Sequence, residues 1–143
     1  MYAIVGLQMY GEYYICCMEK KVIRTEGAPA PIGPYNQAIQ YGDMLYVSGQ
    51  IAIDPQTNEL VQGSIQDETH MVMKNLEAVL SAAGMDFSNI IKSSIFIMDM
   101  GQFAEINEVY AQYFDADPPA RETVQVAGLP KGVNVEISVI AGM

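Results

Sequence analysis

Three residues near the C-terminus have the types that chemistry on a small carboxylic acid would need: Arg121, Thr123 and Glu136. The guanidinium of Arg121 is a planar fork that can bind a carboxylate through two parallel hydrogen bonds. Glu136 could act as a general base on a water molecule beside the bound acid. The alternative is a structural ion pair between Arg121 and Glu136, which needs no substrate. The chain has only one other arginine, Arg24, so an anion site has few cationic candidates.

The predicted strands around these residues would bring their side chains together. Segments 121–127 and 133–140 alternate between aliphatic and polar residues, as strands with two different faces do. A four-residue loop between them predicts an antiparallel hairpin in which Thr123 lies opposite Glu136, with Arg121 close by. An arginine, a hydroxyl and a carboxylate would then share one small area of a sheet face.

Each predicted strand divides into an aliphatic side and a semi-polar side. The aliphatic residues are expected to pack beneath the helices: Leu45, Val47, Ile51, Ile53, Val124, Val126, Val133, Val135, Ile137 and Val139. The opposite side carries small polar groups, an aromatic ring and few charges: Ser48, Gln50, Ser94, Phe96, Arg121, Thr123, Gln125, Asn134, Glu136 and Ser138. Such a composition is typical of a cleft or a subunit interface, because a solvated face would carry more lysine and glutamate.

The rest of the chain predicts a framework of alternating strands and helices. Further strands are expected at 37–41, 44–53 and 91–97, and helices at 64–84 and 102–114. Ser64 followed by Asp67 predicts a capping box, and Gly84 predicts the end of the first helix. The element order is β-β-β-α-β-α-β-β. Because helix crossovers join parallel strands and hairpins join antiparallel ones, we expect an α+β fold with a mixed β-sheet and both helices packed on one face.

Length, charge and cysteine content exclude several classes of protein. The 143 residues suffice for one domain, and seventeen acidic against seven basic residues give a net charge of −10. This charge argues against nucleic acid as a partner, since phosphate binding needs clustered cations. No apolar run is long enough to span a membrane. Cys16 and Cys17 are adjacent and His70 is the only histidine, so we expect a cytoplasmic protein with reduced thiols and no bound metal.

The first 17 residues differ from the rest of the chain. They carry a single charge, Glu12, and four tyrosines, and they have neither the basic start nor the cleavage site of a secretory signal. Met18 opens a more conventional start. We therefore expect residues 1–17 to be an N-terminal extension, either a dispensable leader or an added strand or interface arm, and residues 18–143 to form a single domain.

Several segments along residues 18–143 resemble the RidA/YjgF family in both sequence and spacing. The most specific is Pro-Ala-Arg-Glu-Thr-Val at 119–124, followed by Leu-Pro-Lys at 129–131 and Val-Glu-Ile at 135–137. Upstream, Ile-Gly-Pro-Tyr-Asn-Gln-Ala at 32–38 and Val-Ser-Gly-Gln-Ile at 47–51 are similar to two further family signatures. The segments 82–84 and 106–110 also match the family pattern.

The resemblance implies a fold, an assembly and an activity. The fold would be chorismate-mutase-like, assembled as a homotrimer with active sites at the subunit interfaces. The activity would be hydrolysis of 2-iminobutanoate and 2-iminopropanoate to 2-oxo acids and ammonia, with no metal or cofactor. By similarity, Arg121 holds the substrate carboxylate and Glu136 positions the attacking water. The other implied site residues are Tyr35 as a catalytic residue, and Ser48, Gly49, Thr123 and Asn107 as substrate-binding residues.

Two departures from the family pattern and two other functions remain open. Pro118 stands where the family usually has an aromatic residue, and Thr123 where many members have cysteine. The chain could instead be a binding protein for small carboxylates, or act on a different substrate. RNA cleavage is not favoured by the net charge of −10 or by a chain without a histidine pair.

Overall fold

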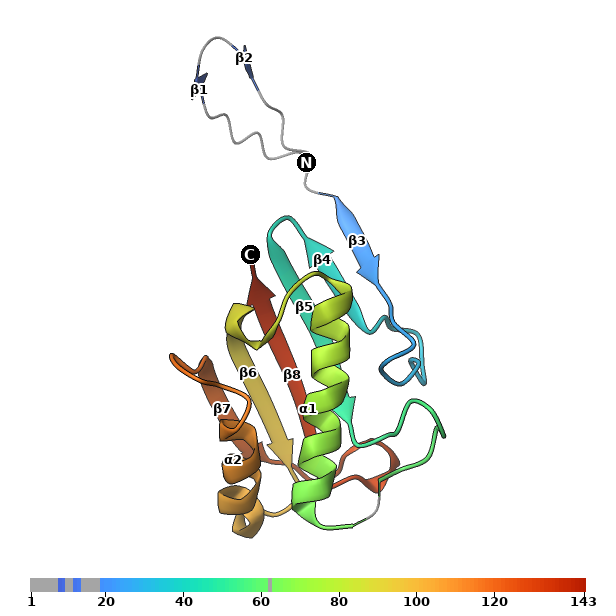
Figure 1. Ribbon diagram of the computed structural model, residues 1–143. Helices are drawn as coiled ribbons and strands as arrows, with labels where there is room; N and C mark the ends of the chain where they lie inside the picture. The colour runs from blue at the N-terminus through green and yellow to red at the C-terminus, as the bar shows by residue number, and fades with distance from the viewer. Residues whose placement is uncertain (1–7, 10–11, 14–18, 62) are drawn as a thin grey trace.

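Six strands form one mixed sheet in the computed structural model, which describes residues 8–9, 12–13, 19–61 and 63–143 (Figure 1). In chain order the strands are β3 (Lys20–Ile23), β4 (Ala38–Tyr41), β5 (Met44–Ile51), β6 (Ile90–Ile97), β7 (Ala120–Gln125) and β8 (Val135–Gly142). Their order across the sheet is β3-β4-β5-β8-β6-β7. Neighbours pair antiparallel except for β6 and β7, which run parallel.

Near the N-terminus, β1 (Gln8–Met9) and β2 (Glu12–Tyr13) pair antiparallel with each other, outside this sheet. The predictions for Cys16, Cys17 and Met18 lie outside the described residues. The proposed division of the chain after residue 17 stays a prediction.

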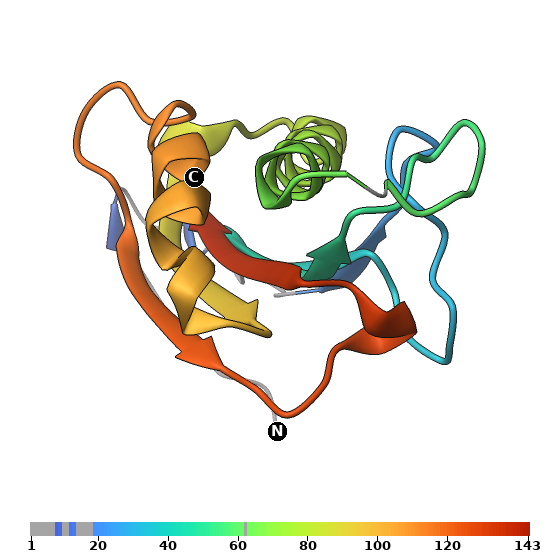
Figure 2. The same ribbon diagram turned by 90° about the horizontal axis from the view of Figure 1, so that it is seen from below.

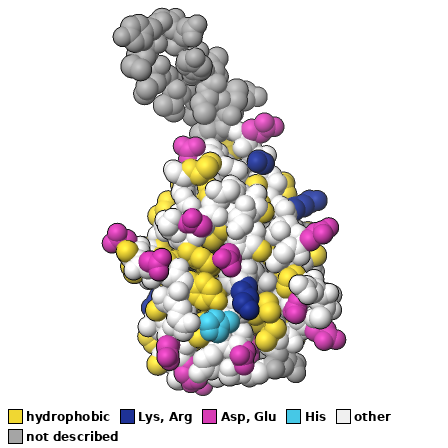
Figure 3. Space-filling view, in the orientation of Figure 1, with side chains coloured by type: hydrophobic (Ala, Val, Ile, Leu, Met, Phe, Trp, Pro, Cys, Tyr) yellow, Lys and Arg dark blue, Asp and Glu magenta, His cyan; other side chains and the backbone are white. Residues whose placement is uncertain are grey.

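Both helices pack on the same face of the sheet (Figure 2). They are α1 (Ile65–Ala82) and α2 (Phe103–Ala111), with short 3-10 turns at Phe87–Asn89, Met100–Gln102 and Pro130–Gly132. The predicted capping box is confirmed: the Ser64 hydroxyl accepts the backbone N–H of Asp67, and the Asp67 carboxylate accepts that of Ser64. Gly84, at φ +75°, follows the helix in the left-handed conformation that glycine adopts without strain. Figure 3 shows this helix-covered side, with acidic side chains scattered over it.

The main core fills the space between the helices and the sheet. The long side chains that are almost fully enclosed there are Leu45, Met73, Leu76, Leu80, Ile95, Ile97, Ile106 and Ile137. They come from α1, α2 and the central strands β5, β6 and β8. The predicted fold class is therefore confirmed, because the sheet is mixed and two helices cover one of its faces.

The predicted C-terminal hairpin is wrong, because β6 lies between β7 and β8. Thr123 pairs with Ile95 of β6, and on the other side of β6 the partner of Ile95 is Ile137. The crossover through α2 returns the chain parallel to β6 at the sheet edge, and segment 126–134 then leads back past β6 to β8. Thr123 and Glu136 are therefore not opposite each other.

Because β7 pairs with β6 and not with β8, its side chains also take the opposite faces of the sheet from those predicted. Arg121 pairs with Ser93, which is fully buried on the helix-covered face, so Arg121 and Thr123 share that face. Val124 pairs with Phe96, whose partner on β8 is Glu136, so these three residues share the open face. Val124, expected beneath the helices, is 40% exposed.

A bulge in β5 reverses a second part of the predicted pattern. The pairing of β5 with β8 shifts register between Val47 and Gln50. Gln50, expected on the semi-polar side, pairs with the core residue Ile137 and is buried. Ile51, expected beneath the helices, pairs with Glu136. An extra residue on one strand changes the phase of its alternation, and the sequence pattern did not reveal it.

Candidate functional site

The predicted site residues fall into two groups on opposite faces of the sheet. Asn107 and Arg121 line the arginine pocket, which also includes Tyr110, Ala111, Phe114, Pro118 and Pro119. Tyr35, Ser48, Gly49 and Glu136 line the glutamate pocket, which also includes Ile32, Ile51 and Pro130. Thr123 lies beside Arg121 along β7 and lines neither pocket. Within one protomer, Arg121 and Glu136 therefore do not meet.

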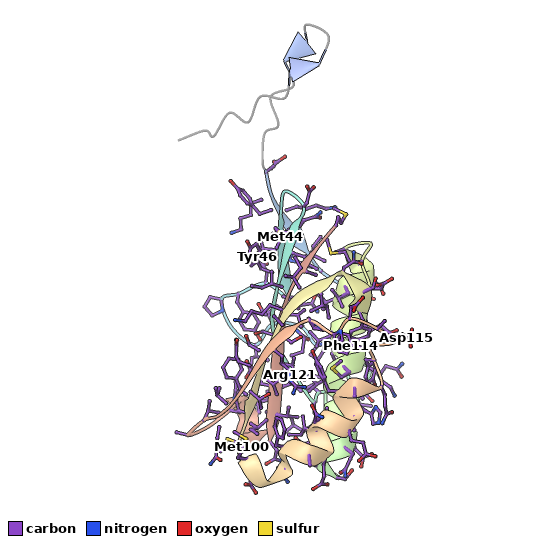
Figure 4. The ribbon with its side chains drawn as sticks, turned by 90° about the vertical axis from the view of Figure 1, so that its left-hand side faces the viewer. Met44, Tyr46, Met100, Phe114, Asp115 and Arg121 are labelled. Atoms are coloured by element: carbon purple, nitrogen blue, oxygen red, sulfur yellow. The ribbon has the colours of Figure 1, made fainter. Side chains whose placement is uncertain are left out.

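In the arginine pocket, α2 holds the guanidinium of the edge strand β7 in place. Arg121 Nη1 donates a hydrogen bond of 2.8 Å to Asn107 Oδ1. The guanidinium carbon lies 5.0 Å from the centre of the Tyr110 ring and 5.8 Å from that of Phe103, within the range of cation–π attraction. Phe103, Asn107 and Tyr110 follow helical spacing, so one face of α2 presents all three. Arg121 and Phe114 are labelled in Figure 4.

Tyr110 links this arrangement to the sheet. Its hydroxyl donates a hydrogen bond of 2.9 Å to Ser93 Oγ, and burial raises the pKa of Tyr110 although that bond and the nearby Arg121 act in the opposite direction. The ring is therefore a neutral, fixed support for the guanidinium.

Among the described residues no carboxylate pairs with Arg121, and the only ion pair joins Lys92 to Glu122. The alternative of an Arg121–Glu136 ion pair within one protomer is wrong.

In the glutamate pocket, the carboxylate of Glu136 lies directly over the backbone of Gly49. A Cβ atom at residue 49 would lie 2.6 Å from Glu136 Cδ, so only glycine leaves room for this side chain. The close approach occurs at the bulge of β5, where regular pairing with β8 is interrupted. The carboxylate is half-buried, and desolvation raises the pKa of Glu136 above its ordinary value.

The remaining predicted residues of this pocket offer hydroxyl groups. The Tyr35 hydroxyl accepts a hydrogen bond of 3.2 Å from the Ile32 backbone N–H, and its ring is 45% exposed. Ser48 Oγ donates a bond of 2.7 Å to the Asn36 carbonyl. Within the described part of the chain, the Glu136 carboxylate has no hydrogen-bond partner. The pocket, of about 330 Å³, can therefore hold a polar molecule beside an unpaired carboxylate.

Thr123 and His70 lie outside both pockets. Thr123 Oγ1 is the one buried side-chain oxygen or nitrogen without a hydrogen-bond partner among the described residues. His70 is half-buried, and its Nδ1 lies 2.9 Å from the Tyr113 hydroxyl. Ile32, Ile51 and Pro130 were not predicted to line the site, because loop residues and a bulged strand carry no periodic signal that assigns them to a pocket.

Two further properties concern metals and membranes. Across residues 19–61 and 63–143, no three His, Cys, Asp or Glu side chains are grouped so that they could hold a metal ion. None of the helices in the described part of the chain has the length and apolar character that a bilayer crossing requires.

Comparison with known proteins gives a family model, curated relatives and solved structures that agree with one another. A family model described as Endoribonuclease L-PSP matches residues 25–143. A mouse protein named 2-iminobutanoate/2-iminopropanoate deaminase is 47% identical over 122 residues, which cover 85% of this chain and 90% of that protein. The crystal structure of YyfA, a conserved Rid family protein of Yersinia pestis, has a TM-score of 0.85 at 48% identity, covering 87% of this chain and 100% of that chain. Escherichia coli TdcF, solved with bound serine, has a TM-score of 0.83 at 46% identity, covering 86% and 98%.

Proposed function

Because this chain belongs to the RidA/YjgF family, we propose that it is an imine deaminase that hydrolyses small 2-imino acids, such as 2-iminobutanoate and 2-iminopropanoate, to 2-oxo acids and ammonia. The observation that carries the proposal is a guanidinium and a carboxylate, each in its own pocket and each without an ion-pair partner among the described residues. A mouse relative that covers most of this chain is named for this reaction.

The two pockets must come from different protomers to act on one substrate. We propose a homotrimer in which the arginine pocket of one protomer lies against the glutamate pocket of the next. The open face of the sheet supports an interface, since it carries exposed apolar side chains on the same face as Glu136. Tyr46 of β5 is 47% exposed and Val124 of β7 is 40% exposed, and Figure 4 labels Tyr46 on the side of the sheet away from α1.

The proposed reaction needs only positioning and proton transfer. The N–H groups of Arg121 that Asn107 does not use bind the substrate carboxylate. Glu136 takes a proton from a water molecule, whose oxygen attacks the imine carbon as the C=N π electrons move to nitrogen. Glu136 passes this proton to the nitrogen, which gives a carbinolamine. Glu136 then takes the proton of the carbinolamine hydroxyl and delivers it to the amino nitrogen, so that the C–N bond breaks, the 2-oxo acid and ammonia leave and Glu136 is ionised again. An imine is already electrophilic, so orienting water against a clamped substrate supplies much of the rate, and the scheme uses no metal or cofactor.

In this scheme Tyr35 and Ser48 border the substrate from the side of Glu136, and Asn107 fixes the guanidinium. The Tyr35 hydroxyl accepts a bond from Ile32, which leaves its own proton free for the substrate nitrogen. Gly49 makes room for the base, and its backbone lies at the pocket wall. Thr123 is the residue of the set with the least direct support, because it lines neither pocket.

A second candidate function is binding of a small carboxylate without turnover. Escherichia coli TdcF, a relative of similar fold, has been solved with bound serine, which carries a carboxylate that an arginine fork could hold. RNA cleavage, which the name of the family model suggests, has no comparable support. Seventeen acidic residues against seven basic ones do not favour a polyanion as substrate, and acidic side chains are scattered over the face in Figure 3.

The test is release of 2-oxo acid from imine generated by a coupled amino-acid dehydratase. We expect Arg121→Ala to reduce the rate to the uncatalysed background with the oligomer intact, and Arg121→Lys to fail as well, since an ammonium cannot reproduce the fork. Lys74→Ala, which removes an exposed cation from α1, should behave as the wild type. An Arg121→Ala variant with most of the wild-type rate would overturn the proposal. A wild type that binds 2-oxobutanoate but never exceeds background would favour the binding protein.

A further inference from the structure

The arginine pocket is polar at one end and apolar elsewhere. Its polar end is the Arg121–Asn107 pair. The remaining walls are the rings of Tyr110 and Phe114, whose centres lie 4.7 Å apart, together with an alanine and two prolines. The Tyr110 hydroxyl already bonds to Ser93, so these walls offer almost no hydrogen-bonding side chains to a ligand. A molecule held there would therefore present a carboxylate at one end and an apolar body at the other.

The apolar wall of the pocket is also more extensive than the substrates named above would cover. It is formed by two aromatic rings, an alanine and two prolines along an open cleft of one protomer. The side chains of 2-iminopropanoate and 2-iminobutanoate are a methyl and an ethyl group, which would contact only a small part of this wall. Each further methylene placed against these walls should improve binding by about fourfold, the equivalent of its transfer out of water.

We propose that the arginine pocket receives the substrate side chain and that this protein favours 2-imino acids with large apolar side chains, branched or aromatic. This inference rests on the proposed function for the reaction. What it adds is the size and polarity of the substrate side chain attached to the imine carbon. Ala111, the last residue of α2, is the wall residue whose size limits that group.

Ala111→Leu tests the inference with little risk to the fold. Ala111 is exposed and leucine is a good helix former, so the added atoms narrow the pocket without entering the core. Phe114 is a poorer choice because its ring packs on Phe87 and Tyr110. The matched control is Ala104→Leu, which makes the same change at an exposed position of the same helix outside the pocket.

The kinetic experiment compares the imines of leucine and phenylalanine with 2-iminobutanoate, each generated by an amino-acid oxidase with catalase present. For the wild type, we expect kcat/KM for the two large imines to exceed that for 2-iminobutanoate. Ala111→Leu should lower kcat/KM at least tenfold for the large imines and less than threefold for the small one, and Ala104→Leu should change neither. A wild type that prefers the small imine, or an Ala111→Leu variant that affects all three equally, would overturn the inference.

A binding experiment separates this inference from the proposed function. Calorimetry with 2-oxo-3-phenylpropanoate and 2-oxobutanoate requires no turnover, because both ligands are products. Tighter binding of the aromatic acid, lost in Ala111→Leu, would support the pocket even if no imine were hydrolysed. Equal binding of both acids by the wild type would refute the pocket even if small imines were hydrolysed quickly.

Discussion

Glu136 and Glu122 both project from the open face of the sheet, yet their surroundings move their pKa values in opposite directions. Lys92 and Ser94 donate hydrogen bonds to Glu122, which lowers its pKa. Glu136 has no such donor among the described residues, and burial raises its pKa. A carboxylate that holds a proton more readily is the better general base near neutral pH. The environment of each residue, and not its type, therefore favours Glu136 over Glu122 as the base that we propose.

We predict an acid limb in the pH profile of kcat/KM that reflects this raised pKa. Glu136 accepts a proton only in its ionised form, so activity is present above its pKa and is lost as the pH falls through it. The midpoint should lie above about 4.3, the ordinary value for glutamate. Glu122→Gln, a change on the same face, should leave the midpoint where it is. A midpoint at or below the ordinary value would mean that Arg121 of the next protomer outweighs burial.

At the scale of elements, one polar side chain of α1 fixes the end of β5 beside the glutamate pocket. Asn75 is almost fully buried, and its Nδ2 donates hydrogen bonds of 3.1 Å to the Ile51 carbonyl and 2.9 Å to the Ile53 carbonyl. These two carbonyls follow the bulge, where regular pairing with β8 is interrupted. The helix therefore helps to hold the bulged strand in the shape that brings Ile51 and Gly49 to the pocket.

Asn75→Leu should destabilise the protein because the Ile53 carbonyl loses its donor, whereas the Ile51 carbonyl keeps its hydrogen bond from the Ile53 backbone N–H. A lost partner for a buried polar group costs about 1–3 kcal/mol, although the leucine has a similar size. The free energy of unfolding in urea is the measurement, and Lys74→Leu, at the exposed neighbouring position, should change it by less than about 0.5 kcal/mol. An Asn75→Leu protein as stable as the wild type would contradict the role assigned to these bonds.

At the scale of the whole molecule, the sheet separates the two halves of the proposed site. The arginine pocket lies between α2 and the edge strand β7, and the glutamate pocket lies at the bulge of β5 beneath Glu136. A layer of backbone divides them, so no side-chain rearrangement within one protomer could bring Arg121 to Glu136. If both residues act on one substrate, assembly is a requirement for activity and not only for stability.

Mixed oligomers provide the corresponding prediction. Arg121→Ala and Glu136→Gln should each be inactive alone, whereas oligomers formed by co-expressing the two variants should recover about a quarter of the wild-type activity. Statistical mixing leaves about one interface in four with an intact arginine from one protomer and an intact glutamate from the next. The same oxo-acid assay measures the recovery. Mixed oligomers as inactive as either variant would show that the two residues do not share a site between protomers.

Much of the local structure could be predicted because its causes are local. The capping box at Ser64, the stop at Gly84 and the apolar stripe between them define α1 within a few residues. The strands predicted at 37–41 and 44–53 likewise correspond to β4 and β5. Asn107 and Arg121 were both named as site residues, and their contact crosses from α2 to β7. Asn75 was not singled out, although an amide on an apolar helical stripe is a recognisable sign of a buried hydrogen bond.

The amino-acid sequence by itself determined the order of the main elements and the α+β class, because spacing, caps and turns act over a few residues. It also named the side chains that we propose for the site. Only the tertiary structure decided which strands are neighbours and which face each side chain takes. The alternation of side chains along a strand shows which residues of that strand share a face, but it does not show which strand lies alongside. The bulge at Ser48 and Gly49 also reverses the alternation in the rest of β5. For that reason the sequence predicts Arg121 and Glu136 on the same face, whereas the strand order of the sheet places them on opposite faces.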